Sequence, residues 1–308
     1  MRIETADFNL LVERALQNSE LTSIRPVIEK ELMHYDILYC LDNAGLLNDL
    51  TFQGGTCLRL CYGANRFSED LDFAGGKNYS SAHLKEMKSC IEKYIGGRYG
   101  LSVTVKEPAS LKKDAKYSEI KIDKWQISVI TSPERRNVPK QRIKIDVANI
   151  PAYTQRTLGL KKNYDFLPDG YEDTLIYTES LDEIMADKMI SLPATQKYIR
   201  HRDLWDLVWL QQQGAILDIS LVARKIDDYR LGNFKELLET RLSSLPAIIA
   251  SKPFLSEMRR FLAADVFDRT LSKEKFKGFL EQSLTELFTG LHHGLYSQNQ
   301  GTTLQFKL

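Results

Sequence analysis

The chain has 308 residues, with 42 basic and 41 acidic side chains and a formal net charge of +1. This balance excludes a uniformly basic protein that coats nucleic acid and an acidic tail protein, although it permits a local basic surface. Hydrophobic residues make up 43% of the chain, which is enough for a packed core and excludes wholesale disorder. No apolar run reaches the roughly 18 residues that a membrane span requires. Because the N-terminus also lacks the pattern of a signal peptide, we expect a cytoplasmic protein with no membrane partner.

The first fifty residues have the hydrophobic spacing of helices. Asp7 is a candidate N-cap for a helix whose apolar residues run from 8 to 16. Pro26 suits the first turn of a second helix, and Gly45 is a candidate end for it. The sequence therefore predicts two N-terminal helices.

Between residues 50 and 147 the hydrophobic period changes from helical spacing to two, which is typical of strands with one buried face. A helical stretch at 83–94 interrupts the series. Short intervals between the later strands favour hairpins and hence a mixed sheet. The predicted strands are 101–105, 120–122, 125–129 and 143–147.

The second half of the chain is predicted to be helical. Residues 151–178 contain proline and glycine with little periodicity, so we expect a long connection there. Ser180 and Glu183 form a capping box that opens the first helix of the second half. We predict an α+β protein with a sheet-containing domain at 1–178 and an all-helical domain at 179–308.

The most informative segment is residues 51–73, TFQGGTCLRLCYGANRFSEDLDF. Gly54, Gly55 and Thr56 precede a short helix, and such a turn lets backbone N–H groups approach an anion such as a phosphate. Asp70 and Asp72 alternate with apolar residues, so on a strand both carboxylates share one face. This pattern predicts a phosphate-binding turn beside a pair of acids.

A third acid, Asp146, alternates with apolar residues in the segment 142–147, RIKIDV. Neighbouring carboxylates repel one another unless a cation lies between them, and oxygen ligands suit Mg²⁺ or Mn²⁺. Three carboxylates beside a phosphate-binding turn describe a two-metal site for phosphoryl or nucleotidyl transfer. The alternative is an ordinary turn followed by a solvent-facing strand.

The order of these motifs resembles the DNA-polymerase-β-like nucleotidyltransferase superfamily, and more closely the AbiEii/AbiGii toxin family of bacterial abortive-infection and toxin–antitoxin systems. The resemblance spans residues from 51 to about 210 and implies a nucleotidyltransferase-type mixed sheet with N-terminal helices, followed by a helical domain. It rests on GGT at 54–56, RFSEDLDF at 66–73, KIDV at 144–147, EIMADKM at 183–189 and RHRDLWD at 200–206.

The resemblance implies a role for each matching position. Asp70, Asp72 and Asp146 match the metal-binding and catalytic acids, and Asp206 matches a further catalytic acid. Arg202 stands where the family often has lysine, and an arginine binds phosphate but is a poor proton-transfer group because it stays charged. The residues expected to bind the nucleotide are Gly55, Thr56, Arg66, Ser68, Lys188, Arg202 and Asp203.

Simpler interpretations exist for the helical motifs. Arg202, Asp203 and Asp206 are three or four residues apart on a helix and could form a solvent-facing ion pair. Lys188 could be surface charge, and His201 could be packed or exposed without acting in catalysis.

A basic segment lies between the acid motifs. Residues 106–144 contain eleven Lys or Arg residues and five Asp or Glu residues. Such a patch suits an RNA backbone, because phosphate contacts dominate nucleic-acid affinity, although a merely soluble surface is the alternative. The residues expected to bind the acceptor are Arg135, Arg136, Lys140 and Arg142.

Together these features predict a Mg²⁺-dependent or Mn²⁺-dependent nucleotidyltransferase that moves a nucleoside monophosphate from a nucleoside triphosphate to an acceptor hydroxyl. The resemblance implies a toxin with a cognate antitoxin encoded nearby, a role in phage defence, and the 3′ end of tRNA as a candidate acceptor. Nucleotidylation of a protein hydroxyl and a non-catalytic nucleotide-binding module remain alternatives. The three acids argue against the second alternative, because a pure binder does not need them.

Overall fold

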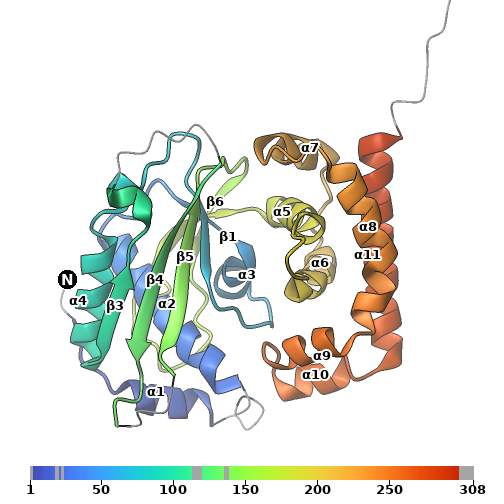
Figure 1. Ribbon diagram of the computed structural model, residues 1–308. Coiled ribbons are helices and arrows are strands. Elements are labelled where there is room, and N and C mark those ends of the chain that lie inside the picture. The colour runs from blue at the N-terminus through green and yellow to red at the C-terminus, as the bar shows by residue number, and fades with distance from the viewer. Residues whose placement is uncertain (1–2, 18–20, 22–23, 113–119, 135–138, 298–308) are drawn as a thin grey trace, which may run out of the picture. The chain divides into compact units, whose positions relative to one another are not determined.

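A computed structural model describes residues 3–17, 21, 24–112, 120–134 and 139–297 (Figure 1). The chain divides into two compact units. Unit 1 contains Met1–Ser180 and the returning segment Arg259–Phe267, and unit 2 contains Leu181–Met258 and Asp268–Leu308. Among the described residues, none of the helices is long and apolar enough to cross a membrane.

Unit 1 is built on a seven-stranded mixed sheet with the strand order β3-β4-β5-β2-β1-β7-β6. β2 pairs parallel with β5, β1 pairs parallel with β7, and the other neighbours are antiparallel. The parallel pairings bring distant segments together at the centre of the sheet. The strands are β1 (Thr51–Gln53), β2 (Leu71–Ala74), β3 (Ser102–Lys106), β4 (Ile122–Ile130), β5 (Gln141–Ala148), β6 (Gln155–Gly159) and β7 (Leu175–Glu179).

The helices of unit 1 pack beside this sheet, with α2 against β5 and α4 against β3 (Figure 1). Asp7 caps α1 as predicted, because its side chain accepts a hydrogen bond from the backbone N–H of Leu10. Pro26 lies in the first turn of α2, also as predicted. The helices are α1 (Phe8–Ala15), α2 (Arg25–Asn43), α3 (Gly54–Cys57), the π-helical turn η2 (Leu58–Tyr62), the 3₁₀ turns η3 (Ser81–Leu84) and η4 (Ala109–Lys112), and α4 (Met87–Tyr99).

The core of the sheet follows the alternation seen in the sequence. Trp125, Ile127, Ile143, Ile145 and Val147 are buried, and the residues between them on β4 and β5 face the other way. In the centre, the rings of Phe52 and Phe73 stack with centroids 5.0 Å apart. These side chains leave the opposite face of β2 and β5 to the polar residues of the candidate site.

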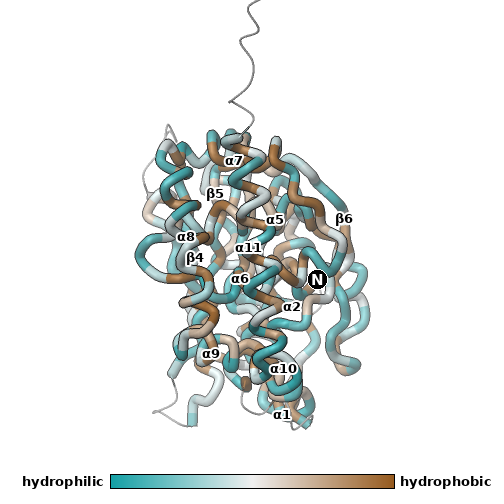
Figure 2. Tube along the Cα trace, turned by 90° about the vertical axis from the view of Figure 1, so that its right-hand side faces the viewer, coloured by the Kyte–Doolittle hydropathy of each residue, from teal (hydrophilic) through white to brown (hydrophobic). Residues whose placement is uncertain are grey.

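Unit 2 is helical, as predicted. α5 packs on α6, α7 and α8, and α11 packs on the same three helices. Brown and teal segments alternate along α11 in Figure 2, as expected for a helix with one buried face. The helices of the second half of the chain are α5 (Leu181–Ala194), α6 (His201–Gln212), α7 (Ile219–Asp228), α8 (Phe234–Ile249), α9 (Lys252–Arg259), α10 (Ala264–Arg269) and α11 (Glu274–Tyr296).

Two sequence predictions about unit 1 are wrong. The segment 151–178 is not only a connection, because β6 lies within it and β7 begins in it. β6 is a polar edge strand with exposed residues, so it needs no apolar alternation. The strand predicted at 120–122 is also not separate: Ile122 begins β4 and is 50% exposed, because the buried face belongs to the odd-numbered residues that start at Asp123.

Candidate active site

The turn at the start of α3 lies against the second aspartate of the acid motif. β1 runs directly into Gly54, whose φ of +77° is in the left-handed region that favours glycine. A Cβ atom at Gly54 would lie 2.9 Å from Asp72 Oδ2. The absence of a side chain therefore lets the turn and the carboxylate come together.

Asp72 and Asp146 are direct partners in the parallel pairing of β2 with β5. Both side chains are half-buried. Asp146 Oδ2 pairs with the Lys124 ammonium group, and Lys124 is the cross-strand neighbour of Asp146 on β4. Asp146 Oδ1 is buried and has no hydrogen-bond partner among the described residues. The register thus brings together two acids that are 74 positions apart in the sequence.

Asp70 is held just before β2 by contacts from two sides. The Thr56 hydroxyl donates a 2.5 Å hydrogen bond to the Asp70 carbonyl oxygen. The Lys144 backbone N–H donates to Asp70 Oδ1 at 3.1 Å, and Lys144 Nζ lies 3.7 Å from Asp70 Oδ2. The Thr56 side chain is buried, and its hydroxyl holds the acid motif through this hydrogen bond. Its nucleotide-binding role stays a prediction.

The acid cluster, defined as Asp70, Asp72 and Asp146, fits a hard divalent cation by its chemistry. All its donors are carboxylate oxygens, which Mg²⁺ and Mn²⁺ prefer, and one of them is the unsatisfied Asp146 Oδ1. Within the described part of the chain, no three His, Cys, Asp or Glu side chains already converge in a metal-binding arrangement. Lys124 and Lys144 instead provide the positive charge beside two of the acids.

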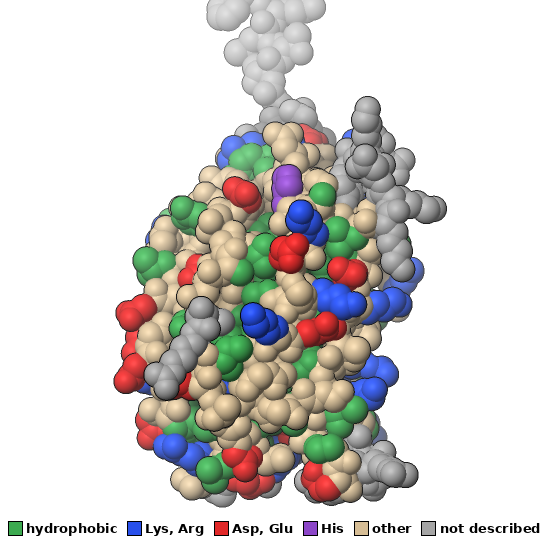
Figure 3. Space-filling model, turned by 90° about the vertical axis from the view of Figure 1, so that its left-hand side faces the viewer, with side chains coloured by type: hydrophobic (Ala, Val, Ile, Leu, Met, Phe, Trp, Pro, Cys, Tyr) green, Lys and Arg blue, Asp and Glu red, His purple; other side chains and the backbone are tan. Residues whose placement is uncertain are grey.

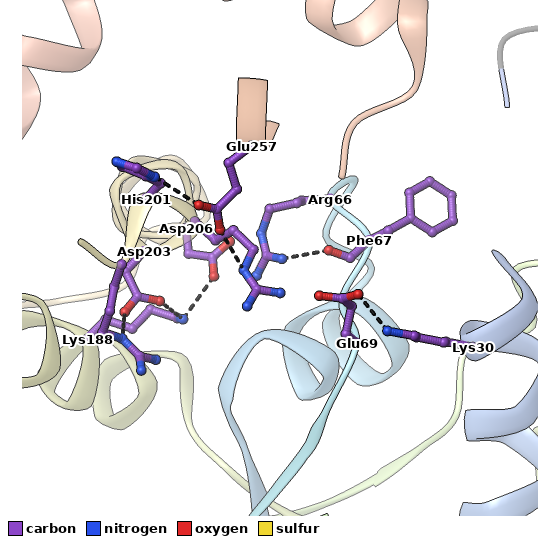
Figure 4. Close-up of polar contacts among 11 residues, drawn as sticks. Lys30, Arg66, Phe67, Glu69, Lys188, His201, Asp203, Asp206 and Glu257 are labelled. Carbon is purple, nitrogen blue, oxygen red and sulfur yellow. Dashed lines mark hydrogen bonds and ion pairs between the residues drawn. The ribbon is translucent and has the colours of Figure 1, made fainter. Parts of the chain in front are cut away.

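Arg66 and Ser68 line the second glycine of the turn. Both side chains are buried, and Arg66 donates from Nη1 to the Phe67 carbonyl oxygen at 2.6 Å (Figure 4). A Cβ at Gly55 would lie 2.4 Å from Arg66 Nη2 and 3.1 Å from Ser68 Oγ. The structure therefore brings three of the predicted nucleotide-binding residues together at one point of the turn.

Two residues of α2 that the sequence analysis did not identify, Lys30 and His34, contact Glu69, the residue directly before Asp70. Lys30 Nζ lies 2.6 Å from Glu69 Oε1 (Figure 4), and His34 Nε2 lies 3.0 Å from the Glu69 carbonyl oxygen. His34 is buried, and burial lowers its pKa to about 4, so the ring is neutral at pH 7. Each contact joins residues that are 35 or more positions apart. The hydrophobic periodicity of a single segment therefore cannot reveal it.

Lys188, in unit 2, lies in a buried ion cluster on α5 and α6. Its Nζ lies 2.8 Å from Asp203 Oδ1 and 2.8 Å from Asp206 Oδ2 (Figure 4). The Lys188 side chain is 6% exposed, so the interpretation as surface charge is wrong. Lys188 and Arg200 hold the pKa of Asp203 well below its usual range despite the burial of that carboxyl.

The two residues between Arg200 and Asp203 contact Glu257 of α9. His201 Nδ1 lies 2.8 Å from Glu257 Oε2, and Arg202 Nε lies 3.4 Å from Glu257 Oε1. The His201 ring also packs edge-on against Phe254, with centroids 6.0 Å apart. In unit 2, therefore, Asp203 and Asp206 share Lys188, whereas Arg202 points to a different carboxylate.

Of the four residues predicted to bind the acceptor, Arg135 and Arg136 lie outside the described residues. Lys140 and Arg142 are exposed. Arg142 has the same strand parity as Lys144 and Asp146, so these three side chains lie along one face of β5. On the face seen in Figure 3, basic and acidic side chains are interspersed.

Comparison with known proteins places this chain in a family. The profile of the family described as "Nucleotidyl transferase AbiEii toxin, Type IV TA system" matches residues 36–289. None of the curated proteins matches the chain. Two similar solved structures are a candidate nucleotidyltransferase from Helicobacter pylori (18% identity, 89% of this chain and 98% of that chain, TM-score 0.46) and JHP933 from Helicobacter pylori (19% identity, 88% and 94%, TM-score 0.42).

Proposed function

The chain belongs to the AbiEii nucleotidyltransferase toxin family, and from this membership and the acid cluster we propose that it is a divalent-cation-dependent transferase of nucleoside monophosphates. The donor is a nucleoside triphosphate and the acceptor is a hydroxyl group. The observation that carries the proposal is the register pairing of Asp72 with Asp146 beside the turn at Gly54. A pure nucleotide binder has no need of paired carboxylates at this place.

The reaction forms one bond and breaks one. The acceptor oxygen attacks the α-phosphorus, the bond between that phosphorus and the bridging α,β-oxygen breaks, and pyrophosphate leaves. The acceptor proton passes to a nearby base or to solvent. A divalent cation, when bound, would stabilise the negative charge that develops on the phosphate oxygens and the leaving group. Asp70, Asp72 and Asp146 would hold it.

The chain's own residues would orient the triphosphate. Gly55 has no side chain, and the Arg66 guanidinium lies where a Cβ atom would be. A phosphate bound at this turn would therefore contact backbone N–H groups and this guanidinium. Ser68 adds a hydroxyl at the same point. Lys188, Arg202 and Asp203 remain predicted nucleotide-binding residues of unit 2, and Asp206 remains a predicted catalytic residue.

For the acceptor we propose RNA, with the 3′ end of tRNA as the first candidate. The support is the exposed basic face of β5, where Arg142 and Lys144 follow one another at two-residue steps from Asp146. A polyanion lying along this face would bring its end to the acid cluster. Nucleotidylation of a protein hydroxyl is the alternative.

The family also suggests the biological setting. A member of a type IV toxin–antitoxin system works beside a cognate antitoxin, so we propose such a partner for this chain, together with a cytoplasmic role in abortive infection as phage defence.

The test is to incubate the protein with each α-labelled nucleoside triphosphate, Mg²⁺ and either purified tRNA or a cell lysate. We expect label in material that ribonuclease destroys and protease does not, and no label with the Asp72→Asn variant. Label that protease destroys would favour a protein acceptor. Label with neither acceptor source, for any of the triphosphates, would contradict the proposed activity.

A further inference from the structure

Two lysines lie directly on the acid cluster, and one of them, Lys144, also belongs to the basic face of β5 proposed above for RNA. Lys124 pairs with Asp146 across the β4–β5 ladder, and Lys144 pairs with Asp70. Both lysines come from the same face of neighbouring strands as the acids. Three carboxylates are thus accompanied by two ammonium groups.

The lysine side chains are themselves exposed, at 57% for Lys124 and 52% for Lys144. Ion pairs of this kind contribute little to stability, because water and salt screen them. The carboxylates are less exposed than the lysines, at 18% for Asp146 and 33% for Asp70, and among the described residues the buried Asp146 Oδ1 has no hydrogen-bond partner. Each lysine is therefore held only weakly, although it lies on a carboxylate that has limited access to water. Another cation can replace such a lysine at little cost.

We propose that Lys124 and Lys144 are exchangeable counter-cations of the acid cluster: they neutralise Asp146 and Asp70 until a divalent cation displaces them. This inference rests on the proposed function, because it takes the acid cluster as the metal site. Without the lysines the three carboxylates would repel one another in the metal-free protein. With them, the cation must compete for the carboxylates, and the metal-free cluster stays intact.

The exchange predicts that removing a lysine charge tightens metal binding. An exposed ion pair is worth up to about 1 kcal/mol, so each lysine should weaken cation binding by about two- to fivefold. A role of these lysines in holding the acids in place for the metal predicts the opposite, namely weaker binding when a lysine is removed. Tighter metal binding in the lysine variants therefore indicates competition, and weaker binding indicates a positioning role.

The experiment titrates Mn²⁺ into the full-length protein and measures free Mn²⁺ by electron paramagnetic resonance. The variants are Lys124→Gln, Lys144→Gln and the double variant. Lys106→Gln is the matched control, because Lys106 is exposed and lies across from Gln126, which is itself across from Lys144. It therefore reports the general effect of one lost positive charge on this face of the sheet.

We expect the dissociation constant for Mn²⁺ to fall about threefold in each single variant and about tenfold in the double variant, with less than a twofold change in Lys106→Gln. Unchanged or weaker binding in the double variant would overturn the inference while leaving the proposed function intact. Binding in the double variant but not in the wild type would support it. If neither protein binds Mn²⁺, while both are folded by circular dichroism, the proposed metal site and this inference both fail.

Discussion

Asp72 of β2 and Asp146 of β5 are direct register partners, so two neighbouring parallel strands present carboxylates side by side. Neighbouring strands lie about 4.8 Å apart, a separation at which two carboxylates repel one another unless a cation or a proton compensates them. The repulsion is a property of the fold, because each acid alternates with buried residues that fix its face.

The first prediction is that neutralising either acid removes metal binding and leaves the fold intact. Asp72→Asn and Asp146→Asn should each weaken Mn²⁺ binding by at least tenfold, because one ligand charge is lost. The free energy of unfolding in urea should stay the same or rise in Asp72→Asn, since a like-charge repulsion is relieved. In Asp146→Asn it should change by less than about 1 kcal/mol, because the variant also loses the ion pair with the exposed Lys124. Asp165→Asn, at an exposed position of unit 1, is the control. Wild-type Mn²⁺ affinity in both Asp72→Asn and Asp146→Asn would refute the metal role.

The second prediction concerns two glycines with nearly the same backbone conformation, Gly54 at φ +77° and Gly76 at φ +78°. Alanine at either position is strained by about 1–2 kcal/mol, because left-handed backbone brings Cβ close to the following carbonyl. A Cβ at Gly54 would also lie 2.9 Å from Asp72 Oδ2, whereas at Gly76 it meets nothing within 4 Å.

Gly54→Ala should therefore abolish transfer, while Gly76→Ala should show a similar backbone cost in urea unfolding and keep activity within a few fold. Transfer assays run beside the unfolding measurements separate the two effects. Equal activity of the two variants would show that transfer does not depend on the close approach of Gly54 to Asp72.

The third prediction concerns the buried ion cluster in unit 2. Lys188→Met should lower the free energy of unfolding by about 3–5 kcal/mol, because it leaves the buried carboxylates of Asp203 and Asp206 without their shared cation. Lys197→Met, at an exposed position, should change it by less than about 0.5 kcal/mol. Urea unfolding of both variants makes the comparison. A small effect at Lys188 would mean that water or Arg200 compensates the two acids.

The fourth prediction is a pH dependence of stability from His34, which faces the charges of Lys30, Glu31 and Asp70. Burial lowers the pKa of His34 to about 4, whereas an unfolded histidine titrates near 6.5. As the pH falls, the unfolded state takes up a proton first. The contribution of His34 is thus complete above about pH 6.5 and is lost as the pH falls towards 4, by about 3 kcal/mol.

His34→Gln tests this, because glutamine keeps an N–H that can donate to the Glu69 carbonyl but does not titrate. Urea unfolding of the wild type and of this variant, at pH 7 and pH 4.5, gives the difference that belongs to His34 alone. We expect the wild type to lose more stability than the variant. An equal fall in the free energy of unfolding of both proteins would show that groups other than His34 cause the loss of stability in acid.

Much of the site could be predicted from short segments. Asp70 and Asp72 share a strand face by simple alternation, and Asp146 does so in its own segment. The alternation of Trp125 and Ile127 predicts which face of β4 carries Lys124. The pairing of Lys124 with Asp146 also requires the register of β4 against β5. Register is a property of two segments together, and neither one alone reveals it.

The rest depends on contacts between distant segments. The link between His34 and Glu69 joins a helix to a loop, and nothing in either sequence marks the partner. The burial of Thr56 and Lys188 has the same origin: a hydroxyl after two glycines and a lysine in a helix have the same sequence pattern whether they face solvent or a carboxylate. β6 was missed because an edge strand need not alternate.

Nucleotidyl transfer is tested most sharply by following α-labelled and γ-labelled nucleoside triphosphate in the presence of Mg²⁺ and tRNA. We expect the α-label in the acceptor and an equal amount of γ-label in pyrophosphate, and we expect Asp146→Asn and excess EDTA to abolish both. Transfer of the γ-label to the acceptor, or release of inorganic phosphate without acceptor labelling, would contradict nucleotidyl transfer at Asp72 and Asp146.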